Sequence, residues 1–85
     1  MIACQFSLYP LREAHLGPAL DEALSVLRSM GLSPAVGTMS TYVEGEDDAV
    51  FDGLKRAFQA LARRGDVVLV ATVSNACPVE PRRGA

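Results

Sequence analysis

Residues 40–74, STYVEGEDDAVFDGLKRAFQALARRGDVVLVATVS, decide the fold of this chain because they combine a clear helix with two flanking strands. Strand-forming residues lie at 40–44, and an apolar, valine-rich run at 67–74 predicts a mostly buried strand. Between them, apolar side chains recur every three or four residues, the spacing of one buried helical face: Val50, Phe51, Leu54, Ala57, Phe58 and Leu61. The stretch therefore predicts one strand–helix–strand unit.

The ends of this predicted helix carry charged residues and a glycine. Acidic residues at 46–48 favour the positive N-terminal end of the helix dipole, and we expect an aspartate there to be the N-cap. Arg63 and Arg64 complement the negative C-terminal end. Gly65 is expected at the C′ position, where a left-handed backbone is common.

The first half of the chain repeats the arrangement. Residues 2–9 predict a strand with one buried face, because apolar side chains occupy alternate positions: Ile2, Cys4, Phe6 and Leu8. Residues 17–30 predict a helix with proline at its first position and Gly31 at its C′ position. Residues 33–38 predict a short strand at a sheet edge, because they contain a proline and a glycine that weaken strand pairing.

The resulting order, β-α-β-β-α-β, predicts a single ferredoxin-like α+β domain. Right-handed crossovers give a four-stranded antiparallel sheet with both helices on one face. The usual strand order of this fold, 4-1-3-2, places the strands at 2–9 and 40–44 in the centre and the strand at 33–38 at an edge. We expect the domain to span residues 1–78 and the C-terminal tail at 79–85 to be disordered.

The composition limits the classes of function. The net charge of −2 and the pI near 5.2 come without a basic stripe, so no nucleic-acid partner is expected. No segment is long enough for membrane insertion, and residues 1–8 do not resemble a signal peptide, which favours a cytoplasmic protein. A chain of 85 residues buries only about 60–65% of its unfolded surface, which favours association into an oligomer.

Residue types that hold metals or carry catalysis are sparse. Cys4 and Cys77 lie far apart and are expected to be reduced thiols, and His15 has no second ligand at metal-binding spacing. No set of a nucleophile, a histidine and an acid is visible, and the glycines mark helix ends instead of a phosphate loop. We therefore expect neither an enzyme nor a metal site nor a cofactor.

The parity of the strands identifies the side chains on the face of the sheet that the helices leave open. They are Gln5, Ser7, Tyr9, Ser40, Tyr42, Glu44, Val68, Val70, Thr72 and Ser74. Hydroxyls and an amide suit hydrogen bonds to a heteroaromatic ring, either tyrosine can stack on it, and Glu44 can balance a cationic group. The valines favour contact with another subunit. The same residues also fit a polar dimer interface or a solvated surface, and parity alone favours that plainer interpretation.

Short motifs spread over nearly the whole chain carry a resemblance to a known family. They are Phe6-Ser7-Leu8-Tyr9-Pro10, Ser40-Thr41 followed by Gly45, Val50-Phe51-Asp52, and Cys77-Pro78. In this order they resemble the YkoF-like thiamine- and hydroxymethylpyrimidine-binding proteins, a group among the small ferredoxin-like thiamine-binding proteins. Those proteins carry two tandem copies of the domain and this chain has one, so a homodimer would replace the tandem pair.

The resemblance implies a homodimer or homotetramer, formed through the sheet, that binds thiamine or its hydroxymethylpyrimidine precursor. The ligand would lie on the open face at a subunit interface, and binding would support vitamin salvage or transport without catalysis. The contacts implied by position are Ser7, Tyr9, Ser40, Thr41, Thr72 and Ser74, to which the open face adds Tyr42 and Glu44. The alternatives are a homo-oligomeric interaction or regulatory domain without a small-molecule ligand, and a cofactor-free enzyme, for which no paired acid and base is visible.

Overall fold

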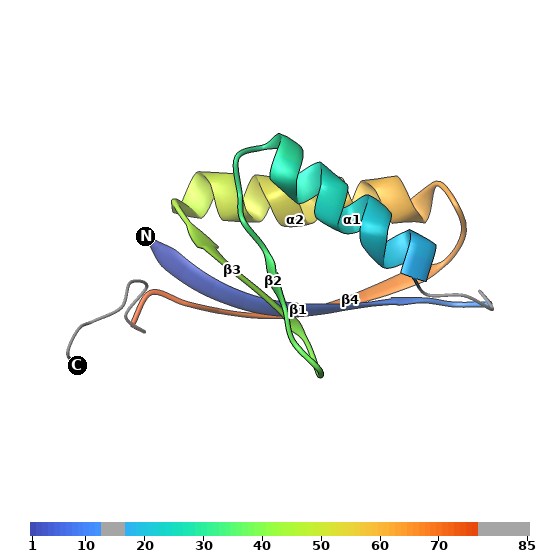
Figure 1. The fold of residues 1–85 in the computed structure, drawn as a ribbon, viewed down its shortest axis with the longest axis horizontal. Helices are drawn as coiled ribbons and strands as arrows, with labels where there is room; N and C mark the ends of the chain where they lie inside the picture. Colours follow the sequence, from blue (N-terminus) through green and yellow to red (C-terminus); the bar gives the residue numbers. More distant parts are fainter. Residues whose placement is uncertain (13–16, 77–85) are drawn as a thin grey trace.

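The computed structural model describes residues 1–12 and 17–76 and confirms the predicted order of elements (Figure 1). The elements are β1 (Ile2–Pro10), α1 (Gly17–Ser29), β2 (Ala35–Val36), β3 (Thr41–Gly45), α2 (Asp47–Ala62) and β4 (Val67–Ser74). Four predicted features lie outside the described residues: His15, Cys77, Pro78 and the tail at 79–85.

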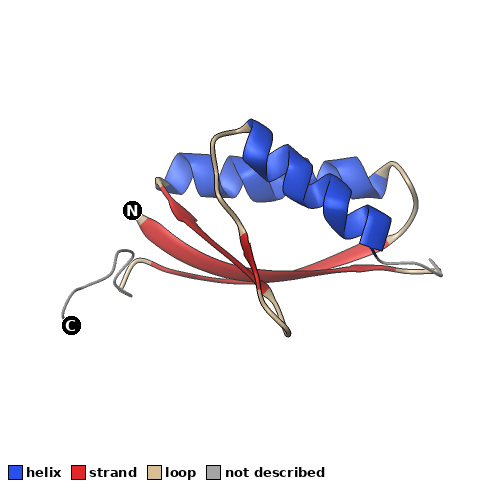
Figure 2. Cartoon of the chain, in the orientation of Figure 1, coloured by secondary structure: helices blue, strands red, loops and turns tan. Residues whose placement is uncertain are grey.

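The four strands form one antiparallel sheet in the order β2-β3-β1-β4, which is the expected 4-1-3-2 order followed from its other end. Both helices cover the same face of this sheet (Figure 2). In the register, Phe6 lies opposite Thr41 on one side and Ala71 on the other. The predicted ferredoxin-like α+β fold is confirmed.

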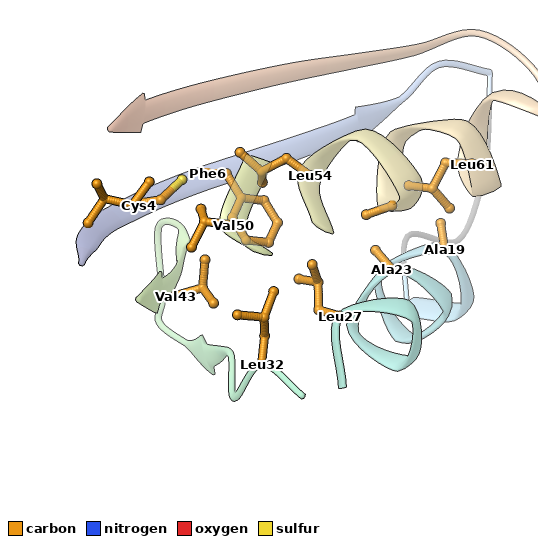
Figure 3. Close-up of a cluster of buried hydrophobic side chains, with 12 residues drawn as sticks. Cys4, Phe6, Ala19, Ala23, Leu27, Leu32, Val43, Val50, Leu54 and Leu61 are labelled. Carbon is orange, nitrogen blue, oxygen red and sulfur yellow. The ribbon is translucent and has the colours of Figure 1, made fainter. Parts of the chain in front are cut away.

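The core lies between the helices and the sheet because alternate residues of β1 and β3 turn their side chains toward α1 and α2 (Figure 3). Its largest fully buried side chains are Phe6, Leu27, Leu61, Val43, Val50 and Cys4. The two helices approach closely at Gly53, where a Cβ atom would lie 2.9 Å from a methyl carbon of Leu27. Neither of the described helices covers the opposite face of the sheet.

The C-terminal end of α1 is predicted correctly, whereas Pro18 is the second residue of that helix and not the first, and both ends of α2 differ from the prediction. Gly31 has φ of 86°, and bonds from the N–H groups of Gly31 and Leu32 back to the last turn complete a Schellman motif. In α2 the N-cap is Glu46, without a side-chain capping bond, and both aspartates lie inside the first turn. The C-cap is Arg63, so Gly65 lies one position beyond the expected C′.

Two predictions of burial are wrong. The run at 67–74 is not the mostly buried strand that its composition predicted, because β4 is an edge strand with an uncovered face. Val68 and Val70 lie on that open face, as strand parity predicted, and are 44% and 55% exposed. Phe51 and Phe58 are 55% and 37% exposed. At 100° per residue they lie on the flank of α2 opposite Gly53, so the helix turns them away from α1.

Candidate functional site

The sheet contains a notch because β1 runs further than β3. The β1–β3 ladder ends at the pair Phe6 and Thr41, whereas the β1–β4 ladder continues to Pro10. From Ser7 onward β1 therefore has no strand partner on that side among the described residues, and alternate residues there have N–H and C=O groups outside the strand ladder. The turn between β2 and β3 lies beside this gap and projects past the sheet on the side away from the helices (Figure 1).

This edge notch encloses a pocket of about 250 Å³ lined by residues 6–9, Leu20 of α1 and residues 36–41. The turn that forms one wall is held by a bond of 2.9 Å from the N–H of Gly37 to the C=O of Ser40. Apolar and hydroxyl-bearing side chains alternate around the pocket, and its volume lies just below the ~300–1,000 Å³ typical of small-molecule sites. The notch has room for one substituted ring.

Four of the predicted contact residues meet in the edge notch: Ser7, Tyr9, Ser40 and Thr41. Three of them reach it from the open face of the sheet. Thr41 differs, because its register with Phe6 places its side chain on the helix side of the sheet. Since the notch lies at the end of β3, it receives side chains from both faces.

Thr41 supplies a buried hydroxyl to the notch. The residue is only 4% exposed, and its hydroxyl forms no hydrogen bond with any part of the chain that the structure describes. Leaving a buried hydroxyl without a partner costs roughly 1–3 kcal/mol. Nearby, the Ser7 hydroxyl donates only a long bond of 3.3 Å to the C=O of Met39. The notch thus offers two hydroxyls with spare hydrogen-bonding capacity.

A second, smaller depression lies on the open face over Ala3. This open-face hollow has a volume of about 150 Å³ and is lined by Ala3, Cys4, Gln5, Tyr42, Thr72 and Ser74. Ala3 forms its floor, because a methyl group leaves space between the longer side chains paired across the sheet. The hollow unites the predicted contacts Tyr42, Thr72 and Ser74, and the Tyr42 hydroxyl donates a bond of 2.9 Å to Oε1 of Glu44.

Seven of the eight predicted contact residues therefore line two neighbouring depressions, and the eighth, Glu44, is linked to the second by the bond from Tyr42. Several lining residues were not among the predicted contacts. Leu20 was missed because it comes from α1, which parity along the strands does not consider. Gln5 was placed on the open face but not among the contacts, although it lies opposite Tyr42 and Thr72. Met39, 87% exposed, stands at the rim of the notch.

The described residues contain no cluster of three or more histidine, cysteine or acidic side chains able to hold a metal ion. Burial raises the pKa of the Cys4 thiol above its ordinary value. A thiol with a raised pKa is a poor nucleophile, so Cys4 serves as a small apolar residue of the core.

Comparison with known protein families shows to which family the chain belongs. A family model described as thiamine-binding protein matches residues 4–75. The chain belongs to this thiamine-binding family. Membership confirms the resemblance predicted from the short motifs, and it gives the protein a thiamine-related role within a family of binding proteins. None of the curated proteins matches the chain.

Solved structures share the fold of this thiamine-binding family member. A domain of unknown function from Bacillus cereus is 29% identical with a TM-score of 0.75, over 86% of this chain and 73% of its own. A hypothetical protein from Methanocaldococcus jannaschii is 21% identical with a TM-score of 0.82, over 93% and 84% of the two chains. A proposed thiamine biosynthesis or salvage protein from Thermotoga maritima is 24% identical with a TM-score of 0.74, over 85% and 80%.

None of the described helices is long and apolar enough to cross a membrane.

Proposed function

We propose that this protein binds thiamine or its hydroxymethylpyrimidine precursor without transforming it, and that the aminopyrimidine ring occupies the edge notch. The observation that carries the proposal is the buried Thr41 hydroxyl, which lines the notch without a protein partner. Membership of the thiamine-binding family supplies the identity of the ligand.

The groups of the notch match the chemistry of an aminopyrimidine. Its exocyclic amine is a donor and its ring nitrogens are acceptors, and the hydroxyls of Ser7 and Thr41 can serve either role. The unpaired backbone edge of β1 offers further N–H and C=O groups in the same direction. Leu8 and Leu20 provide apolar contact for the faces of the ring, and Tyr9 at the rim can stack on it.

Binding without turnover agrees with the residues that line the notch in the described part of the chain, which include no carboxylate and no imidazole. The similar protein from Thermotoga maritima is a proposed thiamine biosynthesis or salvage protein. We therefore assign this protein to the salvage or transport of the vitamin in the cytoplasm, with the bound molecule as its only ligand and no cofactor.

Self-association through the sheet completes the proposal. Tyr9 and Val68 lie opposite each other on the open face, and Val70 lies one pair further along, so exposed apolar side chains gather beside β4. No described strand pairs with the outer edge of β4, which is eight residues long. Exposed apolar surface and free strand edges favour association. In a homodimer or homotetramer, a second copy of the chain would bury the apolar surface and pair with the strand edge. The ligand would then lie at or near the subunit interface.

Calorimetric titration with thiamine and with hydroxymethylpyrimidine tests the proposal. We expect saturable binding by the wild-type protein and a loss of about fivefold or more in Thr41→Val and Ser7→Ala, since each lost hydrogen bond contributes about 1 kcal/mol. Ser25→Ala on the exposed side of α1 is the matched control and should bind normally.

Full affinity in both notch variants would disprove the location of the site. Absence of binding to either compound would disprove the function itself and favour the alternative of a homo-oligomeric interaction domain, which the exposed valines of β4 support.

A further inference from the structure

Glu44 carries a carboxylate on the open face that has no basic partner among the described residues. It is half-buried at the end of β3, and its described polar contact is the bond from the Tyr42 hydroxyl. Within residues 1–12 and 17–76, no basic side chain forms an ion pair with it. A carboxylate without a basic partner attracts a cation by direct charge interaction.

The carboxylate borders the open-face hollow. Glu44 lies directly opposite Ala3, the floor of the hollow, and antiparallel partners have Cα atoms about 4.5–5.5 Å apart. Tyr42, whose hydroxyl holds the carboxylate, lines the same hollow. The volume of the hollow, about 150 Å³, is smaller than that of the notch and suits one five-membered ring.

The hollow lies next to the edge notch on the same face. Gln5 and Tyr42 line the hollow, and the next residues on this face, Ser7 and Ser40, line the notch. Alternate residues of a strand are about 6.6 Å apart, so a ligand whose two rings are joined by a single atom can place one ring in each depression.

We propose that the open-face hollow is a subsite for a permanently cationic heteroaromatic ring, and that Glu44 and Tyr42 select such a ring by charge. This inference rests on the proposed function, with the pyrimidine in the notch and the thiazolium ring of thiamine in the hollow. The carboxylate offers direct charge neutralisation, and the tyrosine ring adds a cation–π contact. The protein therefore binds thiamine more tightly than the uncharged hydroxymethylpyrimidine.

No described arginine or lysine lines either depression, so neither supplies the cationic contacts that phosphate groups favour. The same charge argument predicts weaker binding of phosphorylated thiamine, because its phosphate brings negative charge close to Glu44.

Calorimetry with thiamine and 3-deazathiamine, a neutral analogue of nearly the same shape, separates charge from contact area. We expect the wild-type protein to prefer thiamine by about tenfold, the range of a partly desolvated cation–π and charge contact. Glu44→Gln should reduce the preference to about twofold or less and leave the affinity for hydroxymethylpyrimidine unchanged. Glu46→Gln, the same change at the exposed N-cap of α2, should keep the preference.

Equal affinity of the wild-type protein for thiamine and 3-deazathiamine would overturn this inference and leave the proposed function in place. An equal loss of affinity for both compounds in Glu44→Gln, with normal circular dichroism, would also overturn it, because it would show a role in shaping the site instead of in selecting charge. Failure of all three compounds to bind would overturn the inference together with the proposed function.

Discussion

Thr41 shows at the scale of one residue how a binding site lowers the stability of a fold. Its hydroxyl is buried beside apolar side chains and lacks a partner in the described chain. Valine has nearly the same shape and would remove this cost. We expect Thr41→Val to raise the free energy of unfolding by about 1 kcal/mol in the absence of ligand, as measured by urea denaturation.

Val43 provides the reciprocal control, because it lies on the same strand and face and is 1% exposed. Val43→Thr should lower the free energy of unfolding by about 1–3 kcal/mol. A Thr41→Val protein that is less stable than the wild type would contradict the account, since it would mean that the hydroxyl is satisfied in the free protein.

The buried thiol of Cys4 makes the free energy of unfolding decrease at alkaline pH. Burial raises its pKa in the folded protein above the value in the unfolded chain. The folded state therefore retains the proton where the unfolded state loses it, and stability falls as the pH rises above the unfolded pKa and through the folded pKa.

We expect a smaller alkaline loss of stability in Cys4→Ala than in the protein with Cys4, both carrying Cys77→Ser so that one thiol titrates. Denaturation at pH 7 and pH 10 under reducing conditions measures the difference. Equal losses in the two proteins would show that burial does not perturb the thiol.

At the scale of an element, the end of α1 depends on a single glycine. Gly31 adopts φ of 86°, which costs a residue with a side chain about 1–2 kcal/mol. Gly31→Ala should lower the free energy of unfolding by about this amount in urea denaturation. Gly17→Ala is the matched control, because an added Cβ there has no atom within 4 Å, and it should leave stability nearly unchanged. Similar effects of both substitutions would count against the Schellman motif.

Sequence periodicity predicts the order and type of the elements. It predicts the residues at which they begin and end less accurately. The alternation in β1 and the three- and four-residue spacing in α2 each reflect a face that packs on the core, so both were predicted. The valine-rich composition of residues 67–74 predicted a mostly buried strand, because composition does not reveal which neighbours a strand has. The strand order 4-1-3-2 and strand parity were the better guides, since they placed β4 at an edge with Val68 and Val70 on the open face. The exposed Phe51 has the same cause: periodicity does not fix which flank of a helix meets another element.

At the scale of the whole molecule, the site arises because the β1–β3 ladder is shorter than the β1–β4 ladder. Parity along the strands predicted that Ser7, Ser40, Tyr42 and Thr72 share one face. The structure adds that Ser7 and Ser40 meet in the notch and that Tyr42 and Thr72 meet in the hollow. The sequence did not predict that β1 runs beyond β3, because ladder length depends on where pairing stops. That mismatch creates the edge notch, which joins side chains from both faces of the sheet and one from α1.

Self-association is also a property of the whole molecule. We expect a mass in solution of two or four times the 9.0 kDa chain, measured by light scattering on a size-exclusion column. Val70→Lys should shift the protein toward a monomer, because it places a charge in the exposed apolar surface beside β4. Ser25→Lys on α1 should leave the mass unchanged. A monomeric wild-type protein at micromolar concentration would contradict association through the sheet.

The central claim is that thiamine binds in the edge notch, and a titration of the ¹⁵N-labelled protein with thiamine, followed by amide NMR shifts, tests it most directly. The account predicts that the largest shifts lie at residues 7–9 and 37–41, with smaller shifts around Gln5 and Tyr42. Absence of shifts at millimolar thiamine, or shifts confined to the outer surface of α2, would contradict it.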